Sequence, residues 1–490
     1  EFGIYTIMTR KITIDPVTRV EGHGRVTIHL DEYGQVKDSF FHIVEFRGFE
    51  RFIQDHPYWE APVLVQRLCG ICPVSHHLAA AKAIDQIVGI DPKDLSATAT
   101  KLRRLMHFGQ LFQSHALHFF YLASPDLLFG VDAPAEKRNV IAVAAEHREL
   151  AIQGITMRKF GQEIIKAVAG KKIHGILAVP GGVHKTFSEN ERDYFLDGKN
   201  IENIDTMIAW SQAMVAFMRE YHEKNHKFLD EFAAFPSGHL GMVSPDGAME
   251  MYDGKLRAID YEGKRTLHDI STDLYQDYFA EGVAQWSYMK FPYLKSLGRE
   301  NGWNRVGPLA RINVCDYIPT PLAEKARQDF VAFTGRKINN STMFSHWARL
   351  IEVLHSAEVI KDLLHDPEIF GTELVRKGER RSKGIGIIEA PRGTLTHHYE
   401  VDEKGMITKC NLIVSTTHNN DAMNTAVKWV ANNVISRKGH ITDGMLNQVE
   451  VAIRAYDPCL SCATQAMGKM PLKAELYNQK GDLIDERFKA

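Results

Sequence analysis

The amino-acid sequence predicts an α+β fold that is mainly helical: a large helical bundle with small peripheral β-sheets in the N-terminal and C-terminal regions. From about residue 61 to residue 365, apolar residues recur at three- and four-residue steps, which is the spacing of amphipathic helices. Alternation of apolar and polar residues, which is typical of strands, flanks this region over residues 24–46 and 384–414. With 490 residues and 44% hydrophobic composition, the chain can bury a large core.

The N-terminal β-rich region covers residues 11–50. Residues 24–30 and 35–46 alternate on either side of the turn signal DEYG at 31–34, which predicts a β-hairpin. The segment from Met8 onward reads like a natural start, so we expect residues 1–7 to be an upstream extension. We expect residues 8–466 to form a single domain.

The helical region is expected over residues 61–365, with long helices over 101–123, 141–168, 204–232 and 322–364. Within it, residues 238–266 are rich in Gly, Asp and Tyr and predict short peripheral strands. A second β-rich region follows over residues 384–414, and helices return over 420–455. Residues 457–466 then form the metal-binding C-terminus of the predicted domain.

Charge and hydropathy exclude several classes of protein. Lys plus Arg total 59 against 61 Asp plus Glu, so no basic surface predicts nucleic-acid binding. No apolar run approaches the roughly 18 to 20 residues that cross a bilayer, which predicts no membrane insertion and a cytoplasmic protein. The sequence holds neither a Gly-x-Gly-x-x-Gly after a strand nor a Walker A motif, so any nicotinamide chemistry belongs to another subunit.

Four of the six cysteines form two Cys-x-x-Cys pairs near opposite ends of the chain: Cys69 with Cys72, and Cys459 with Cys462. A two-residue spacer lets both sulfurs of a pair converge on one metal ion. Thiolates suit nickel and iron as well as zinc, and a thiolate can also bridge two metals. The two remaining cysteines are expected to be small buried hydrophobic residues: Cys315 and Cys410.

Spacing alone favours a structural zinc site of four cysteines. Zinc ribbons, however, hold their pairs about 15 to 20 residues apart, whereas here almost the whole chain lies between the pairs. A buried catalytic metal therefore fits better. Four thiolates near one ion would favour positive neighbours, and Arg67 and Arg392 are the candidates.

Five segments, in this order, resemble the large subunit of nickel-iron hydrogenases. They are DPVTRVEGH at 15–23, FRGFE at 46–50, RLCGICPVSHH at 67–77, EAPRG at 389–393 and DPCLSCATQ at 457–465. The resemblance extends over about residues 11–466. It implies reversible heterolytic cleavage of dihydrogen at a nickel-iron centre.

The resemblance also implies a role for each ligand of that centre. Cys69 and Cys459 would bind nickel terminally, while Cys72 and Cys462 would bridge nickel to an iron that carries carbon monoxide and cyanide. The pocket around those ligands would be lined or supported by Pro391, Arg392, Thr416, His76 and Asp457. His76 would support a cysteine through a hydrogen bond, and His77 is assigned no role.

Heterolytic cleavage needs a base for the proton. By resemblance, Glu21 is the relay carboxylate that takes the proton from Cys459, and a carboxylate near a thiolate can relay if burial raises its pKa. Arg392 would polarise dihydrogen or stabilise charge beside the metal, because its own charge is not lost near neutral pH. From the residues alone, Glu21 would be a surface acid at a strand end.

The family also places a magnesium ion near the second cysteine pair. Glu50 matches its glutamate ligand and the carbonyl of Leu412 its backbone ligand, but Gln465 stands where the family has a histidine. The sequence departs a second time after that position, where related large subunits are trimmed. Residues 467–490 predict a hairpin that is either a maturation extension or a retained tail.

The segments VEFRGFE, SHH and LSCAT are most similar to the cytoplasmic bidirectional, NAD-linked type of hydrogenase. That type implies an iron-sulfur small subunit, flavin- and NAD-binding diaphorase subunits, a maturation protease and nickel-insertion chaperones as partners. The alternatives are an NADP- or deazaflavin-linked hydrogenase, a hydrogen sensor, a non-catalytic scaffold and a zinc-clipped protein. Of these, scaffold relatives lack the four cysteines.

Overall fold

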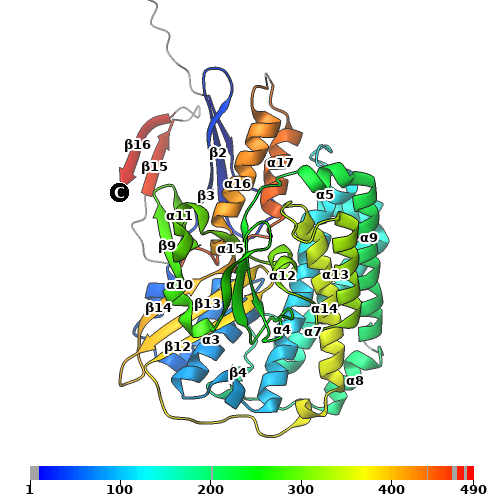
Figure 1. Ribbon diagram of the computed structural model, residues 1–490, viewed down its shortest axis with the longest axis vertical. Coiled ribbons are helices and arrows are strands. Elements are labelled where there is room, and N and C mark those ends of the chain that lie inside the picture. The colour runs from blue at the N-terminus through cyan, green and yellow to red at the C-terminus, as the bar shows by residue number, and fades with distance from the viewer. Residues whose placement is uncertain (1–9, 200–201, 439, 466–471, 479–482, 490) are drawn as a thin grey trace, which may run out of the picture.

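A computed structural model describes residues 10–199, 202–438, 440–465, 472–478 and 483–489. Residues 1–7, expected to be an extension, lie outside the described residues. Long helices gather on one side of the molecule and small sheets on the other, as predicted (Figure 1). The helices are α1 Phe49–Phe52, α2 Ala61–Leu64, α3 Pro73–Ile87, α4 Ala97–Leu117, α5 Ser124–Phe129, α6 Val140–Glu146, α7 Arg148–Ala169, α8 Glu189–Leu196, α9 Ile204–Glu231, α10 Tyr275–Tyr278, α11 Gly298–Asn301, α12 Pro308–Val314, α13 Pro321–Thr334, α14 Phe344–His365, α15 Ser415–His418, α16 Asn420–Val430 and α17 Asp443–Arg454.

The strands form several small sheets. They are β1 Arg10–Ile14, β2 Gly24–Leu30, β3 Val36–Ile43, β4 Ala178–Val179, β5 Gly182–Val183, β6 Gly238–Val243, β7 Lys255–Ile259, β8 Arg265–Ile270, β9 Phe279–Ala284, β10 Ser287–Leu294, β11 Asn304–Arg305, β12 Lys383–Ala390, β13 Gly393–Val401, β14 Ile407–Ile413, β15 Leu472–Tyr477 and β16 Leu483–Lys489. The predicted N-terminal hairpin is β2–β3, and β1 extends it to a three-stranded antiparallel sheet.

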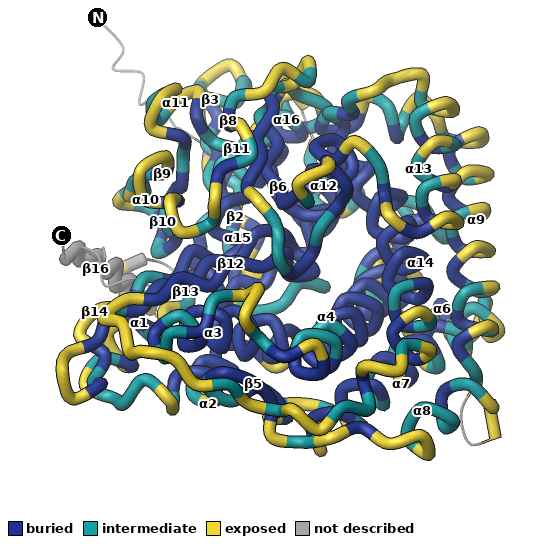
Figure 2. Tube along the Cα trace, turned by 60° about the horizontal axis from the view of Figure 1, so that its bottom comes forward, coloured by how far each residue is buried: buried dark blue, intermediate teal, exposed yellow. Residues whose placement is uncertain are grey.

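The bundle is built around α4 and α14, which are buried along nearly their whole length (Figure 2). The helices α7, α9 and α13 show an exposed face to solvent and a buried face to this core, which is the amphipathic pattern that predicted them. Two predicted helices are each interrupted. The segment 141–168 breaks at His147, and the segment 322–364 breaks after Thr334, where Gly335 takes a left-handed conformation that ends α13.

Strands inside the helical region are more numerous than predicted. Residues 238–266 form β6, β7 and the start of β8, in a four-stranded sheet of order β11-β6-β7-β8. The hairpin β9–β10 and the short pair β4–β5 were not predicted, because each is short and lies between helical segments. The helical region 420–455 is also interrupted, by a π-helical turn over Ala431–Ile435 and a loop before α17.

The second β-rich region forms the predicted antiparallel sheet, in the order β12-β13-β14. Helix α3 packs against β12 so closely that a Cβ at Gly384 or Gly386 would lie 1.9 Å from the carbonyl oxygen of Ala83 or Ala79. Glycine is needed at both positions, because only a residue without a side chain allows this approach. The contact fixes the start of α3, where Cys72 lies, beside the turn between β12 and β13, where Arg392 lies.

The predicted C-terminal hairpin is β15–β16, which lies at the periphery and away from the helical bundle (Figure 1). Residues 466–471, which join it to the rest of the chain, lie outside the described residues. Whether this hairpin is removed stays a prediction. No helix in the described part of the chain is long and apolar enough to cross a membrane.

Candidate metal centre

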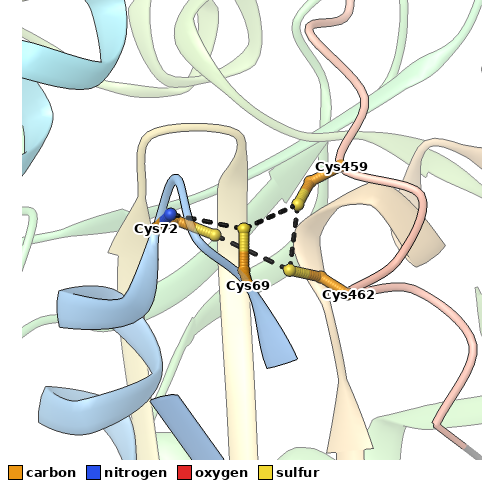
Figure 3. Close-up of side chains that lie close together, drawn as sticks. All are labelled: Cys69, Cys72, Cys459 and Cys462. Atoms are coloured by element: carbon orange, nitrogen blue, oxygen red, sulfur yellow. Dashed lines mark hydrogen bonds between the residues drawn. The ribbon is translucent and has the colours of Figure 1, made fainter. Parts of the chain in front are cut away.

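The four cysteines of the two Cys-x-x-Cys pairs converge on one point in the interior. Their sulfurs all lie within 4.8 Å of one another, and all four residues are buried. Figure 3 shows the sulfurs pointing toward one another, with Cys459 3.2 Å from Cys69 and 2.9 Å from Cys462, and Cys72 3.7 Å from Cys462. No other group of three or more potential metal ligands is found among the described residues.

The first pair lies between a 3₁₀ turn, Val65–Leu68, and the start of α3. The N–H groups of Ile71 and Cys72 both point at the sulfur of Cys69, at 3.2 and 3.4 Å. Pro73 is the first residue of α3, where its fixed φ suits a helix and its missing N–H is not needed. This local geometry directs both sulfurs of the pair to the same side.

The second pair follows α17 and is held by segments from elsewhere in the chain. The N–H of Leu460 donates to the carbonyl of Glu21, and the N–H of Cys459 donates to the hydroxyl of Thr416. Thr417 donates to the carbonyl of Ala463. The segment between β1 and β2 and the helix α15 therefore hold the loop that carries the second pair.

The four buried cysteines shift one another's pKa values in opposite directions. Hydrogen bonds from the Cys459, Cys462 and Cys69 thiols, and from His76, hold the pKa of Cys72 well below its usual range. Burial raises the pKa of Cys459 and Cys462 well above theirs. Four buried thiols of this kind ionise together only when a cation binds them, so this set of donors fits a resident metal centre.

Arg392 supplies the buried positive charge beside the cluster. Its guanidinium donates to Asp457 at 2.9 Å and to the hydroxyl of Ser114 at 3.4 Å. Although burial works to lower it, the pKa of Arg392 is held well above its ordinary value by Asp457 and the nearby cysteines. Burial raises the pKa of Asp457, and Arg392 opposes this effect. Arg67, the other candidate, is exposed and contacts His174 instead.

A small cavity of about 10 Å³ adjoins the cluster, which is room for about one water-sized molecule. Two of its lining side chains carry buried polar atoms with no hydrogen-bond partner: the Oγ of Ser75 and the Nε of Arg392. Polar atoms buried in this way are costly unless a bound group satisfies them. Both atoms could donate hydrogen bonds to a small group bound beside the cluster. Its lining includes Cys72, Ser75, His76, Pro391, Arg392, Val414, Ser415, Thr416 and Cys459.

Glu21 lies at the cluster, although it is partly exposed. The thiol of Cys459 donates to its carboxylate at 3.0 Å, and the N–H of Ser461 donates to it at 3.2 Å. The hydroxyl of Ser461 also donates to it. The carboxylate therefore bridges a buried sulfur and the surface, which is the arrangement that proton transfer from the sulfur requires.

The residues expected around a magnesium ion come together as well. The carboxylate of Glu50 accepts from the N–H of Leu412 at 2.8 Å, and the N–H of Glu50 donates to the carbonyl of Gln465 at 3.2 Å. The side-chain oxygen of Gln465 accepts from the N–H of Phe49 at 3.2 Å. The ammonium of Lys290 lies 3.6 Å from Glu50, and burial raises the pKa of that carboxyl.

Residues that were assigned no chemistry have structural partners. His77 lies between the carbonyl of Pro62 and the N–H groups of Leu177 and Ala178, and burial lowers its pKa to about 4. Cys315 and Cys410 are buried, and burial raises the pKa of Cys315 to about 12. Both predictions, of an inert histidine and of two buried cysteines, agree with these contacts.

Sequence reasoning missed several residues that contact the site. Ser461 lies within the second cysteine pair, and its position beside Cys459 could have suggested a partner for Glu21. Ser75 lines the cavity, and His397 and Tyr399 lie behind His76. The last two gave no signal, because their positions depend on how the strand β13 packs.

Comparison with known proteins agrees with this geometry over nearly the whole chain. A HoxL-like family profile matches residues 11–46, and the profile of the nickel-dependent hydrogenase family matches residues 47–148 and 246–465, which is more than half of the chain. The chain is 50% identical to the NAD-reducing hydrogenase HoxS subunit beta of Cupriavidus necator, over 98% of this chain and 100% of that protein. It is 41% identical to an F420-non-reducing hydrogenase subunit of Methanothermobacter thermautotrophicus, over 97% and 99%.

Solved structures give the same result. A chain in the crystal structure of an NAD⁺-reducing [NiFe]-hydrogenase in the H₂-reduced state is 53% identical, with a TM-score of 0.90 over 93% of this chain and 99% of that one. A [NiFeSe] hydrogenase variant from Desulfovibrio vulgaris Hildenborough, with a TM-score of 0.75 at 22% identity over 93% and 99%, shares the fold.

Proposed function

The chain belongs to the nickel-dependent hydrogenase family, and from this premise we propose that it is the catalytic large subunit of a hydrogenase that passes the electrons of dihydrogen to NAD. The observation that carries the proposal is the buried set of four cysteine sulfurs with the carboxylate of Glu21 at 3.0 Å from Cys459. A nickel-iron centre bound there supplies the Lewis acid and redox chemistry for heterolytic cleavage of dihydrogen.

We assign the ligands from the resemblance to nickel-iron hydrogenases. Cys69 and Cys459 would bind nickel alone, and Cys72 and Cys462 would be shared by nickel and iron. By the same resemblance, the iron would carry carbon monoxide and cyanide, and these small ligands would lie at the cavity beside Cys72. The unpartnered Nε of Arg392 and Oγ of Ser75 support this assignment, because both can donate hydrogen bonds into the cavity, while Pro391 and Thr416 supply its remaining walls.

Side chains of this protein accept the proton and pass it to solvent. The thiol of Cys459 donates directly to Glu21, so a proton on this sulfur passes to the carboxylate without a large movement. Ser461 orients the carboxylate with both its N–H and its hydroxyl. Because Glu21 is partly exposed, the proton can then leave to solvent.

Arg392 works on the other side of the cluster. Its guanidinium is 3% exposed, and its pairing with Asp457 fixes the orientation of the guanidinium. A buried, always charged group in this position stabilises negative charge that develops beside the metals. Asp457 acts as a positioning residue in this scheme, and the buried walls of the cavity exclude water.

The magnesium ion is a further part of the proposal. Its ligands would be the carboxylate of Glu50, the carbonyl of Leu412 and the side-chain oxygen of Gln465, which neighbour one another. Oxygen ligands of this kind suit a hard cation. Glu50→Gln should lower the magnesium content of the purified protein. An unchanged content would remove Glu50 from the ligand set and leave Lys290, 3.6 Å away, as the charged partner of this carboxylate.

The partners follow from the relatives and from the chain's own motifs. Two relatives at 50% and 53% identity are NAD-reducing, whereas this sequence has no nucleotide-binding motif and no cysteines for iron-sulfur clusters beyond its metal site. A small iron-sulfur subunit, together with flavin-containing diaphorase subunits, would therefore carry the electrons to NAD in the cytoplasm. A maturation protease that removes residues 467–490, and nickel-insertion chaperones, complete the proposed set of partners.

Turnover assays on the complex purified from its native host test the proposal. We expect dihydrogen-dependent reduction of NAD, and the reverse reaction from NADH. If the complex reduced deazaflavin or NADP but not NAD, that compound would replace NAD as the proposed electron acceptor. The proposal that the chain is a hydrogenase subunit would stand. Infrared bands of metal-bound carbon monoxide and cyanide test the iron site, and mass spectrometry of the active protein tests whether residues 467–490 are removed.

A further inference from the structure

Three fully buried side chains form a hydrogen-bonded row behind the metal cluster. The Nδ1 of His76 lies 3.0 Å from the Nε2 of His397, and the Nδ1 of His397 lies 2.7 Å from the hydroxyl of Tyr399. None of the three is more than 1% exposed. His76 is on α3 and lines the cavity beside Cys72, while His397 and Tyr399 are on β13.

The donor and the acceptor of each hydrogen bond in the row can be assigned, starting from Tyr399. Among the described residues, the hydrogen-bond partner of the Tyr399 hydroxyl is His397 alone. A buried hydroxyl that accepted from His397 would leave its own hydrogen without an acceptor, which costs the free energy of a lost hydrogen bond. Tyr399 therefore donates to the Nδ1 of His397.

The remaining protons follow from this first one. Burial holds the pKa of His397 well below its ordinary value, so the ring is neutral and carries one proton. With Nδ1 accepting from Tyr399, that proton is on Nε2, and it is donated to the Nδ1 of His76. His76, with Nδ1 accepting, carries its own proton on Nε2, and its side chain is hydrogen-bonded to Cys72, one turn earlier at the start of α3.

We propose that Tyr399 and His397 are positioning residues that fix the tautomer of His76, so that its Nε2–H donates toward the sulfur of Cys72. This inference rests on the proposed function, because it assigns Cys72 as a ligand shared by both metals. A donor to a metal-bound thiolate withdraws electron density from the sulfur and so tunes the metals. The opposite tautomer would present a lone pair to a negatively charged sulfur.

The chain offers a matched control for the tyrosine. The hydroxyl of Tyr275 lies 2.9 Å from the Nδ1 of His398, the residue next to His397 on β13, and this pair does not lead to His76. Tyr399→Phe and Tyr275→Phe each remove one hydroxyl from a buried tyrosine–histidine pair. Only the first removes the donor that orders the row.

The test is infrared spectroscopy of the purified complex, with nickel and iron contents measured on the same samples. We expect Tyr399→Phe to keep both metals but to shift the metal-bound carbonyl band, and Tyr275→Phe to leave the band at its wild-type position. Unshifted bands in both variants would overturn the inference while leaving the proposed function intact. Absence of such bands from the metal-loaded wild type would instead overturn the proposed function.

A second pair of variants serves if Tyr399→Phe does not fold. In His397→Gln, the amide oxygen can accept from Tyr399 and the amide nitrogen can donate to His76, whereas His397→Leu can do neither. We expect the carbonyl band of His397→Gln to lie closer to the wild-type position than that of His397→Leu. Equal shifts in the two variants would contradict a role for the hydrogen-bonded row.

Discussion

The carboxylate of Glu21 lies 3.0 Å from the sulfur of Cys459, although 438 residues separate them in the sequence. The backbone of Glu21 also forms a β-bridge with Cys459, so the acid and the thiol are held by main chain as well as by side chains. The pair thus belongs to the rigid part of the molecule. It gives the cluster one route for a proton toward solvent.

Replacement of this acid should separate proton transfer from metal binding. Glu21→Gln keeps the shape of the side chain, and its amide oxygen can still accept from the N–H of Ser461, but the amide cannot take up a proton. Because a positioned acid or base contributes about 10²- to 10⁴-fold to a rate, turnover should fall by at least about 10²-fold. Nickel and iron contents should stay at the wild-type level.

A matched control is Glu45→Gln, which alters a neighbouring, partly exposed carboxylate that contacts His23 at 3.6 Å. This variant should turn over at close to the wild-type rate. Near-normal turnover of Glu21→Gln would rule out Glu21 as the relay.

The sulfur of Cys459 should be required for the chemistry itself. Cys459→Ser replaces a soft thiolate by a hydroxyl that binds nickel weakly and ionises at a much higher pH. We expect loss of hydrogen–deuterium exchange, a reaction that needs no electron acceptor. Cys315→Ser, at a buried cysteine outside the cluster, should retain it. Exchange that persisted in Cys459→Ser would remove this residue from the ligand set.

The buried ion pair of Arg392 and Asp457 should matter far more than a surface pair. Its side chains are 3% and 2% exposed, and loss of one partner from such a pair destabilises by about 3–5 kcal/mol. Arg392→Met should therefore lower the unfolding free energy by that amount and reduce the metal content. Arg299→Met removes the bidentate but more exposed pair with Asp421 and should cost about 1 kcal/mol or less. Equal losses in urea unfolding would contradict the prediction.

A second buried pair gives a pH dependence with a definite sign. Arg311 donates to both oxygens of Glu352 at 2.6 Å and, although burial opposes it, lowers the pKa of Glu352 from 4.5 to about 2. A depressed pKa stabilises the fold above pH 4.5, and this stabilisation is lost as the pH falls toward 2. Glu352→Gln should cost about 3–5 kcal/mol at pH 7.

The comparison between wild type and Glu352→Gln should be made by urea unfolding at several pH values. The difference in unfolding free energy should be constant at neutral pH and should narrow as the pH falls from 4.5 toward 2, because in this range Glu352 takes up a proton in the unfolded chain before it does so in the folded protein. A difference that stayed the same below pH 4.5 would show that the ionisation of Glu352 does not stabilise the fold.

Local patterns in the sequence predicted the elements that carry strong periodicity. The helix α9 and the hairpin β2–β3 begin and end close to the predicted residues, because each has an uninterrupted apolar face or alternation. The helix predicted over 101–123 begins four residues earlier, as α4, and its last six residues form a π-helical turn. The breaks at His147 and Gly335 were not visible, because helical spacing continues on both sides of each. The short strands β9 and β10 depend on pairing with each other and gave little local signal.

The candidate site, like the fold, could be predicted only in part from the sequence. The two cysteine pairs were visible because their ligand spacing is local. What brings the second pair to the first is a set of long-range contacts, such as those of Leu460 with Glu21 and of Cys459 with Thr416. Glu21 could be found through family resemblance alone, since it looks like an ordinary surface acid in the sequence, whereas the charge of the thiolates named both Arg392 and the exposed Arg67 without choosing between them. Neither local patterns nor family resemblance predicted Tyr399, because its role depends on contacts between β13 and α3.

Elemental analysis of the protein purified from its native host tests the central claim most directly. We expect about one nickel and one iron for each chain, held by the four sulfurs that lie within 4.8 Å of one another. One zinc for each chain, with neither nickel nor iron, would contradict it.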